Sequence, residues 1–448
     1  MGSMQLKVAK FGGTSVADAA QLLRVKAIVE ADPGRRWVVP SAPGKRTSSD
    51  QKITDLLYLC HEHAKRGVGF TEVFGLISAR YREIVSELGL SLPIGEILDE
   101  IRKRITAGEG ADYAASRGEF VNGHIVAALL RYDFVDPAEI VLFDERGQFL
   151  PEETNKAVGA RLAKHERSVV SGFYGSKPDG SIKTFSRGGS DISGAIVARG
   201  VGADVYENWT DVSGLLMADP RVVDKPKKIA TITYRELREL AYMGATVLHD
   251  EAIFPVRQSG IPVNIRNTND PDDPGTMIVR GNGDRNAQHG SLPITGEITG
   301  VAGRKGFSII AIEKTLMNAE VGFGRRLLNV LETNGVNFEH MPSGIDTVSL
   351  VIASSELQGR TEKLVKEITL QCHPDSIDVE HGLALIATVG RGMMRIPGMA
   401  ARVMTALADA KVNIRMIDQG SGELNIIVGV READFEIAVR AIYSAFVS

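Results

Sequence analysis

The C-terminal third of the chain contains an internal repeat, and this feature limits the possible folds more than any other. The segment VGFGRRLLNVLETNGVNFEHM, which begins at Val321, aligns without a gap to the segment that begins at Pro397, 76 residues later. Each copy has the pattern of a strand, a glycine-marked turn, an amphipathic helix, two strands separated by a polar turn, and a second helix. This order is typical of the βαββαβ ferredoxin-like unit. Two copies at this spacing predict a pair of small domains and not a solenoid.

Before the repeat, the chain has the alternating pattern of an α/β domain. Short runs of β-branched or aromatic residues alternate with segments of helical periodicity between Gln5 and Val279. Helical spacing is clear at 16–29 and 234–254, whereas 50–132 contains little strand signal. We therefore predict a mostly parallel central sheet flanked by helices, with a helical insertion.

These patterns divide the chain into four parts. Residues 4–280 are expected to form the α/β domain, and 281–300 a linker that is rich in Gly and Asn. The two ferredoxin-like domains are expected at 301–375 and 376–448, and an exchange of strands between them is left open. A chain of 448 residues is too long for one ordinary core, which agrees with this division.

Composition argues against several classes of partner. The net charge is −4 and no long basic block is present, so nucleic acid is not expected as a partner. No apolar run approaches the roughly 18 residues of a membrane span, and the start, MGSMQLK, has no apolar signal core. Cys60 and Cys372 are the two cysteines, which fits a reducing compartment, and we expect a cytoplasmic protein.

The first candidate site is KFGGTSVAD, which follows a predicted strand and precedes a predicted helix. Gly12 and Gly13 allow a sharp turn and the close approach of backbone N–H groups to an anion. Ser15 with Asp18 fits a capping box, and Lys10 adds a positive charge. A plain turn with an exposed lysine is the alternative, and the stretch fits neither a Walker loop nor a GxGxxG turn.

A second stretch of the same kind is FSRGGSDISGAIVARG. Arg187 precedes another Gly-Gly pair, and its guanidinium suits bidentate binding of a carboxylate or phosphate. Ser190 then opens a helix of small residues, where Asp191 could serve only as a charge that stabilises the helix start. Two turns that combine a cation, two glycines and a hydroxyl are much less expected by chance than one.

Two further loops follow predicted strands, where open α/β sheets bind their ligands. TDVSGLLMADPRV contains Thr210, Asp211 and Arg221, which suit a nucleotide, although a plain loop explains the segment equally well. In VVPSAPGKRTSSD, the hydroxyl residues Ser41 and Thr47 follow another predicted strand. Both loops therefore predict ligand contacts at the carboxyl ends of strands.

Glu119 is the acidic residue of ASRGEFVNGHIVAALL, an otherwise small and apolar helix. A carboxylate on a buried helix face needs a partner, which could be structural or a ligand. The nine histidines, by contrast, have no obvious catalytic or metal-ligand spacing. No metal-ligating side chain is therefore predicted.

Together these stretches resemble the aspartate kinases of the amino-acid-kinase family over nearly the whole chain. The C-terminal repeat resembles the paired ACT domains with which those enzymes bind amino-acid effectors. The resemblance implies an amino-acid-kinase-type α/β domain followed by two ferredoxin-like ACT domains. It rests on the order and spacing of KFGGTSV, SRGEF, SGFYGS, SRGGSD, WTDVSG, ADPR, MGATVLH and NTNDPDDPGT.

The resemblance implies transfer of the ATP γ-phosphoryl group to the side-chain carboxylate of L-aspartate. The product would be 4-phospho-L-aspartate, on the route to lysine, threonine, methionine and diaminopimelate. Lys10 would neutralise the transferring group, Gly12 and Gly13 would supply backbone donors, Asp191 would organise the site, and Mg²⁺ would bridge the β- and γ-phosphates. Because the acceptor carboxylate is already ionised at neutral pH, catalysis is expected to come from positioning and charge neutralisation.

The resemblance also implies binding roles for individual residues. Arg187 would bind the α-carboxylate of aspartate and Glu119 its ammonium group. Ser41, Thr47 and Ser190 would complete the aspartate site. The residues implied to bind the nucleotide are Lys10, Gly13, Thr210, Asp211 and Arg221.

The chain departs from the family pattern in two places. Many aspartate kinases have GAKVLHP where this chain reads GATVLHD, so Thr246 replaces a lysine that touches the nucleotide and Asp250 replaces a proline. One cation is therefore missing from the expected phosphate site, and Arg221, Lys227 or Lys228 would have to compensate. VVPSAPGK also departs from the more usual VVSAMGK around its serine.

In paired ACT domains the effector lies near the turn that follows the first strand. The resemblance implies contacts from Met317, Asn318 and Gly322, together with Glu339 and Ser343. Glu339 suits an effector ammonium group, but an exposed strand acid is the equal alternative. The methionine pair of GRGMMRIPG suits a core or an interface better than a ligand. The resemblance also implies lysine or threonine, or both, as effector, and a homodimer or dimer of dimers through the ACT domains.

Three alternatives remain. A relative of the same fold could phosphorylate another acid such as glutamate, but the ACT pair argues against it. A nonenzymatic amino-acid sensor would be expected to have a broken site, whereas the site residues are present. A fused homoserine dehydrogenase is not expected, because the sequence ends at Ser448, directly after the second repeat.

Overall fold

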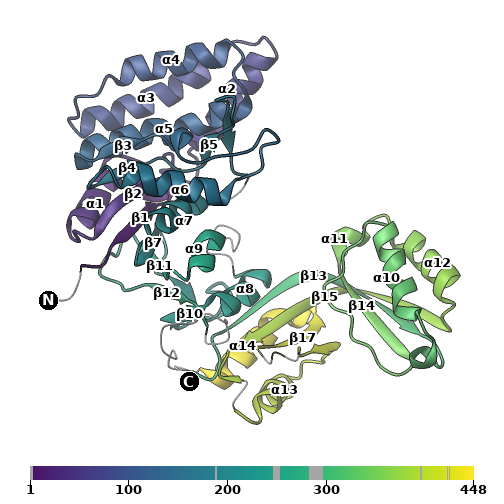
Figure 1. The fold of residues 1–448 in the computed structure, drawn as a ribbon. Coiled ribbons are helices and arrows are strands. Elements are labelled where there is room, and N and C mark those ends of the chain that lie inside the picture. The colour runs from purple at the N-terminus through teal and green to yellow at the C-terminus, as the bar shows by residue number, and fades with distance from the viewer. Residues whose placement is uncertain are drawn as a thin grey trace. The chain divides into compact units, whose positions relative to one another are not determined.

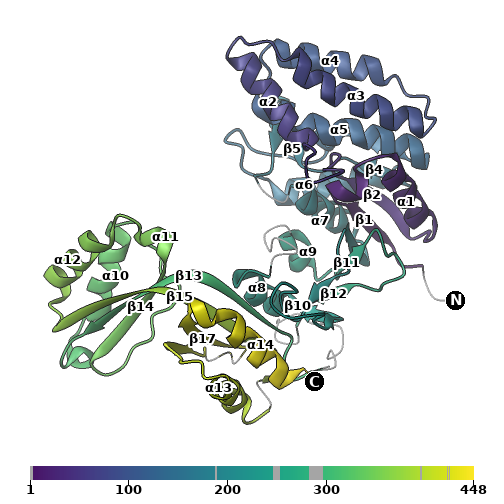
Figure 2. The same cartoon turned by 180° about the vertical axis from the view of Figure 1, so that it is seen from behind.

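The chain forms two compact units (Figures 1 and 2). Unit 2 combines Ser291–Ser448 with two earlier segments, Leu216–Ile229 and Arg235–Thr246, and unit 1 contains the other residues. The computed structural model describes residues 4–186, 189–245, 253–281, 296–393, 396–420, 422 and 424–447.

Unit 1 contains the mostly parallel sheet that the sequence predicts. The strand order is β10-β12-β11-β7-β1-β2-β4-β3, with β1 between β7 and β2 and parallel to both. β11 and β12 form an antiparallel pair toward one edge. The central strands β1 and β7 are buried along nearly their whole length, as expected for strands with helices on both faces. The strands are β1 (Lys7–Phe11), β2 (Arg35–Pro40), β3 (Asp133–Val135), β4 (Ser168–Val170), β7 (Val205–Thr210), β10 (Thr231–Thr233), β11 (Val263–Asn267) and β12 (Thr276–Val279).

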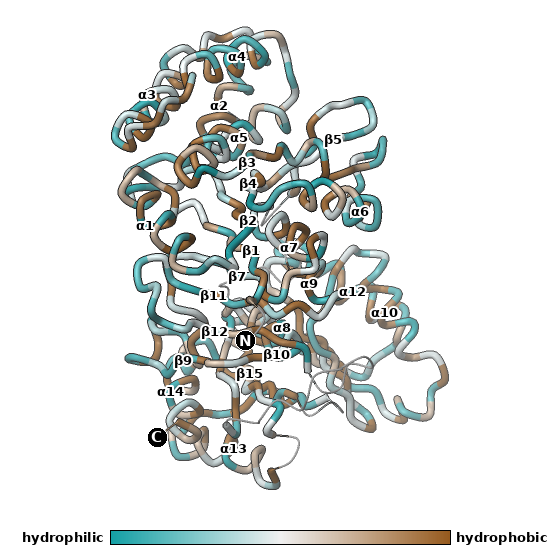
Figure 3. Tube along the Cα trace, turned by 60° about the vertical axis from the view of Figure 1, so that its left-hand side comes forward, coloured by the Kyte–Doolittle hydropathy of each residue, from teal (hydrophilic) through white to brown (hydrophobic). Residues whose placement is uncertain are grey.

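The predicted helical insertion is formed by α2 to α5. α5 packs against one face of this sheet, and α3 and α4 form an outer layer beyond it (Figure 1). Their apolar residues share a core with Ala9, Phe11 and Val38 of the central strands. α3 and α4 carry hydrophilic and hydrophobic residues in turn (Figure 3), and Ile77 and Leu98 lie on their buried sides. The helices of unit 1 are α1 (Ala19–Glu30), α2 (Ile53–Lys65), α3 (Thr71–Glu87), α4 (Ile94–Thr106), α5 (Ala111–Leu130), α6 (Pro151–Leu162), α7 (Gly189–Val201) and α9 (Phe254–Ser259).

Short elements complete the part of the chain before residue 281. β5 pairs with β6 in an antiparallel hairpin, and β8 pairs with β9. The turn after β1 is a single 3-10 segment, η1 (Gly13–Val16). The remaining elements are β5 (Tyr174–Ser176), β6 (Ile182–Thr184), β8 (Leu215–Leu216), β9 (Lys228–Ile229), η2 (Pro137–Glu139) and α8 (Tyr234–Tyr242).

Unit 2 is built on an antiparallel sheet with the strand order β14-β13-β15-β17-β16. β13 and β15 are each 14 residues long and pair along their whole length. The elements are β13 (Gly300–Glu313), η4 (Met317–Ala319), α10 (Phe323–Thr333), β14 (Thr347–Ala353), α11 (Ser354–Leu357), α12 (Thr361–Cys372), β15 (Ser376–Val389), α13 (Met399–Asp409), β16 (Met416–Asp418), β17 (Asn425–Arg431), η6 (Glu432–Asp434) and α14 (Phe435–Phe446).

The two long strands serve two separate hydrophobic cores. One core combines α10, α12 and β14 with Ile310 and Ile312 from the C-terminal half of β13. The other combines α13, α14 and β17 with Val301 from the N-terminal end of β13 and Ile386 from β15. Each core and the elements around it form one lobe, the first around Ile310 and the second around Val301. Each lobe uses part of both long strands, so the two lobes share them. Ala218 and Val223, from the segment that joins unit 2 early in the chain, belong to the second core.

The repeat is visible in the backbone at the start of α10 and α13. Gly322 and Gly398 are the residues that precede these helices, with φ angles of 85° and 90°. Side chains are strained in this left-handed region because Cβ approaches the backbone.

Within the described part of the chain, no helix is long and apolar enough to cross a membrane.

We expect Gly398→Ala to lower the thermal unfolding midpoint of unit 2 by about 2–4 °C, which corresponds to about 1 kcal/mol. No other atom lies within 4 Å of the added Cβ, so backbone strain is the sole expected cause. Gly324→Ala is the control, because Gly324 is helical, has open space for a Cβ and has no left-handed φ. Equal effects of the two substitutions on the midpoint, measured by calorimetry, would contradict this reading of the repeat.

Candidate active site

The Gly-Gly turn after β1 lies at the centre of unit 1. The N–H of Gly12 donates to the carbonyl of Trp209, at the end of β7, over 2.9 Å, and η1 begins at Gly13. The capping box expected from Ser15 and Asp18 is wrong. Asp18 itself caps α1 by accepting from the N–H of Gln21, whereas the Ser15 hydroxyl lies 2.7 Å from that of Thr268. The serine is buried because the short 3-10 turn carries it inward before the helix starts.

Lys10 is buried at the end of β1, which excludes the alternative of an exposed lysine. Its ammonium group forms an ion pair with Asp191, from the first turn of α7, and lies 3.5 Å from the Oδ1 of Asn208, on β7. The Nδ2 of Asn208 donates to Asp191 over 2.9 Å. β1 and the consecutive elements α7 and β7, which lie about 180 residues later in the chain, thus converge on one charged cluster at the carboxyl end of β1. We call Lys10, Asp191 and Asn208 the lysine cluster.

Two serines predicted to bind aspartate meet beside α7. The hydroxyl of Ser41 donates to that of Ser190 over 2.8 Å. The backbone of Ser41 is fixed on both sides, since its N–H donates to the carbonyl of Phe11 and its carbonyl accepts from Asn122 over 2.6 Å. The geometry therefore brings the start of α7 and the loop after β2 together.

Glu119 is buried in α5, and its Oε2 has no hydrogen-bond partner among the described residues. Burial raises the pKa of Glu119 to about 8, although the N–H of Ala42 and the charge of Arg117 act in the opposite direction. The Arg117 guanidinium contacts the hydroxyl of Ser116 and the ring of Tyr113, and forms no ion pair with Glu119 among the described contacts. A buried carboxyl oxygen without a partner is a strong candidate for binding a cationic ligand group.

The other predicted residues do not all join this cluster. The hydroxyl of Thr47 lies 3.1 Å from that of Ser49 in an exposed loop, and Thr210 donates to Asp211 over 3.2 Å at the end of β7. The Arg221 side chain belongs to unit 2 and is 86% exposed, where it pairs with Asp219. The predicted sites Arg187, Thr246 and Asp250 lie outside the described residues.

Asn208 and Glu207 are two polar residues that the sequence analysis missed. The strand segment VYENW places both in the buried centre of β7. Glu207 accepts from Arg35 over 2.7 Å and from the indole N–H of Trp209 over 2.9 Å, so it is a structural acid. Polar residues inside an apolar strand were the available signal, because such groups need partners when they are buried.

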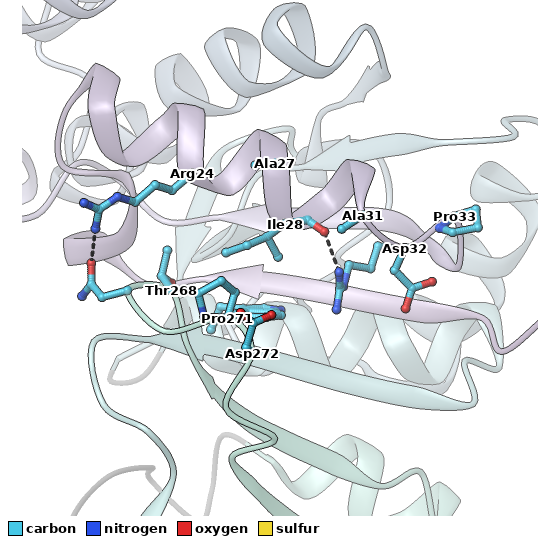
Figure 4. A pocket seen from close by; sticks show the side chains of 12 residues that line it. Arg24, Ala27, Ile28, Ala31, Asp32, Pro33, Thr268, Pro271 and Asp272 are labelled. Atoms are coloured by element: carbon cyan, nitrogen blue, oxygen red, sulfur yellow. Dashed lines mark hydrogen bonds between the residues drawn. The ribbon is translucent and has the colours of Figure 1, made fainter.

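A separate pocket of about 550 Å³ lies between α1 and the turn that follows β11 (Figure 4). Arg24 closes one end by donating to the side-chain oxygen of Asn269 over 2.7 Å. Ile28, Pro271 and Asp272 also line it, and the sequence-predicted site residues are not among its lining residues. The pocket therefore does not belong to the lysine cluster.

The predicted effector residues lie in the first lobe of unit 2, where Met317, Asn318 and Ser343 are near the end of β13, whereas Glu339 lies beside Val351, toward the opposite end of β14. Met317 is buried in its core, the N–H of Asn318 donates to Ile345, and Ser343 forms a bridge with Val348. Glu339 is not a simple exposed acid, because its Oε1 lies 3.0 Å from Arg304 while its buried Oε2 has no partner among the described residues. Burial raises the pKa of Glu339. In the second copy, Met393 is a core residue, as expected, and Met394 lies outside the described residues.

This fold and this cluster define an amino acid kinase. The chain matches the amino acid kinase family over residues 5–267 and an ACT domain family over residues 386–446. It is 41% identical to aspartokinase 3 of Bacillus subtilis over 98% of both chains, and it therefore belongs to the aspartokinase family. The resemblance inferred from the sequence motifs is confirmed.

Solved structures show the same relationship. The chain is 53% identical to the aspartate kinase of Clostridium acetobutylicum, with a TM-score of 0.90 over 99% of this chain and all of that one. Aspartokinase III of E. coli is 26% identical and has been solved in two states. Its complex with aspartate and ADP matches with a TM-score of 0.71 over 98% of this chain and 99% of that one, and its complex with lysine and aspartate with 0.73 over 99% and 100%.

We expect Glu119→Gln to stabilise unit 1 relative to the unmodified chain, and to do so more at pH 8 than at pH 5. A folded-state pKa raised from 4.5 to about 8 means that the unfolded chain releases a proton which the folded chain keeps. Stability is therefore complete below about pH 4.5 and is lost as the pH rises toward 8. Glutamine cannot ionise and should remove this dependence.

The test is the difference in thermal unfolding midpoint between variant and unmodified protein, followed from pH 5 to pH 8. Glu145→Gln is the control, since Glu145 is exposed. A difference that stays constant across this range would show that Glu119 is already ionised in the folded protein.

Proposed function

We propose that the chain transfers the γ-phosphoryl group of MgATP to the side-chain carboxylate of L-aspartate. A carboxylate oxygen attacks the γ-phosphorus, the bond to the β–γ bridging oxygen breaks, and 4-phospho-L-aspartate and ADP are released. The observation that carries this proposal is the lysine cluster at the carboxyl end of β1, next to a Gly-Gly turn. The relative solved with aspartate and ADP supports the same pair of ligands.

Glu119 is the proposed ligand for the ammonium group of aspartate. Its buried Oε2 has no hydrogen-bond partner among the described residues, and once Glu119 ionises this oxygen can accept from an ammonium group, so that binding would satisfy both groups. Ser41, Ser190 and Thr47 are proposed to contact the same substrate. The assignment of Arg187 to the α-carboxylate remains a prediction from the sequence motif.

Lys10 is proposed to neutralise the transferring phosphoryl group, with backbone donors from Gly12 and Gly13. Asp191 and Asn208 hold the ammonium group of Lys10 in place before the substrates arrive. The acceptor is already an anion, so the main obstacle is repulsion between two negative groups, and fixed positive charge lowers it. In this mechanism no side chain has to remove a proton to create the nucleophile.

Thr210, Asp211 and Arg221 remain the proposed nucleotide contacts. Thr210 and Asp211 lie at the end of β7, where a parallel sheet presents ligand-binding groups.

We also propose that lysine, threonine or both bind near Gly322 and Glu339 in unit 2, which the relative solved with lysine supports. A homodimer or dimer of dimers through the ACT domains, and a cytoplasmic location that suits the two free cysteines, complete the proposal.

The function is tested by ADP release from MgATP with L-aspartate, D-aspartate, L-glutamate and L-homoserine, with acyl phosphate trapped as the hydroxamate. We expect hydroxamate with L-aspartate, and less of it when the effector amino acid is added. Folded protein that binds lysine or threonine without any turnover would instead support an amino-acid sensor.

We expect Lys10→Met to lower kcat by about 10²–10³-fold while the protein remains folded, because a fixed charge at the reacting phosphoryl group is lost. Lys7→Met is the matched control, since Lys7 lies on the same strand and pairs with Asp32 instead. Steady-state kinetics with both substrates would measure the difference. A kcat for Lys10→Met within threefold of the control would contradict the role of Lys10.

A further inference from the structure

The loop between β2 and α2 carries two proposed substrate residues, yet it contains no helix or strand. Residues 41–52 connect these elements and include Ser41 and Thr47. A loop without regular structure needs other contacts to hold catalytic groups within about 1 Å of their working positions. One side chain, Arg80, supplies three of these contacts; it projects from α3 and is 5% exposed.

The Arg80 guanidinium joins two separate segments of backbone. Its Nη2 donates to the carbonyls of Gly44 and Ala17, the latter over 3.0 Å, and its Nη1 donates to the carbonyl of Gln51 over 3.2 Å. Ala17 ends the turn that begins with the Gly-Gly pair, whereas Gly44 and Gln51 lie near the middle and the end of the loop. One side chain therefore fixes the phosphate turn and the substrate loop together.

The same two segments touch directly on their other side. The N–H of Gly44 donates to the carbonyl of Gly13 over 2.8 Å. A Cβ added to Gly44 would lie 2.6 Å from the carbonyl carbon of Gly13, so only glycine allows this approach. Any shift of the loop would therefore displace Gly13, which we propose as a phosphoryl-binding donor.

Asp50 completes the contact. Its Oδ2 lies 3.1 Å from Arg80 and accepts from both the N–H and the side chain of Arg46 at 3.0 Å. The N–H and side chain of Arg46 and the charge of Arg80 lower the pKa of Asp50 to about 2. The carboxylate of Asp50 is thus ionised at neutral pH, and it joins the end of the loop to Arg46 in its middle.

We propose that Arg80 is a positioning residue for phosphoryl transfer, which holds the 41–52 loop against the Gly-Gly turn so that Thr47 and Gly13 act on the same aspartate and phosphoryl group. This inference rests on the proposed function of those two residues. Arg80 contacts backbone and Asp50, not the substrates. A planar guanidinium reaches three carbonyls at once, and the single nitrogen of a lysine cannot replace that fork.

The test is Arg80→Lys, with kcat and KM measured for L-aspartate and MgATP beside the thermal unfolding midpoint. We expect KM for aspartate to rise about tenfold or more and kcat to fall about 30–100-fold, in protein that is folded at the assay temperature. Arg82→Lys is the matched control, because Arg82 is an exposed arginine on the same helix. A merely structural role would reduce the folded fraction, and hence the apparent kcat, without changing KM.

An unchanged KM for aspartate in Arg80→Lys would overturn the proposal. If Arg80→Lys fails to fold, Asp50→Asn serves as the test instead. We expect Asp50→Asn to raise KM for aspartate about threefold or more, and an unchanged KM would contradict the proposal. If the unmodified chain forms no hydroxamate, the proposed function fails, and amide hydrogen exchange then decides the inference alone. Residues 42–51 should exchange at least tenfold faster in Arg80→Lys than in the control, and equal exchange would overturn it.

Discussion

The partly buried ion pair between Lys10 and Asp191 is the interaction on which the arrangement of unit 1 depends. Two opposite charges in a poorly solvated place remain there only when they are paired and hydrogen-bonded, and Asn208 supplies the further bonds. The pair fixes the end of β1 to the start of α7, and β7 lies beside both. The Gly-Gly turn after β1 and the start of α7 are thereby brought to one side of the sheet.

Glu119 differs from this pair, because it is buried and has no ionic partner among the described residues. Its pKa of about 8 results from burial of the carboxyl group away from water. A cationic ligand group bound to its Oε2 would stabilise the ionised form. The site thus combines a cation that an acid and an amide hold in place with a second acid that is buried alone. The proposed roles assign the phosphoryl group to Lys10 and the ammonium group of aspartate to Glu119, and they agree with membership of the aspartokinase family.

Local patterns in the sequence predicted a large part of this structure. Strand β1, the turn after it, the helical insertion and both copies of the repeat follow from periodicity and glycine placement. Patterns between distant residues were harder to read. The contact of Asn208 with Lys10 depends on strand order, and the sharing of β13 and β15 by two lobes depends on which half of each strand meets which helix. The prediction of a capping box at Ser15 was wrong, because a 3-10 turn places the N-cap of α1 three residues later, at Asp18.

The central claim is that Glu119 receives the ammonium group of aspartate, and calorimetric titration with L-aspartate at pH 7 tests it most directly. Repeating the titration in buffers of different ionisation enthalpy counts the protons released on binding. A carboxyl group with a pKa of about 8 is mostly protonated at pH 7 and must ionise to bind an ammonium group. The account therefore predicts release of about one proton per aspartate, and none in Glu119→Gln. Aspartate binding to the unmodified protein without proton release would contradict it.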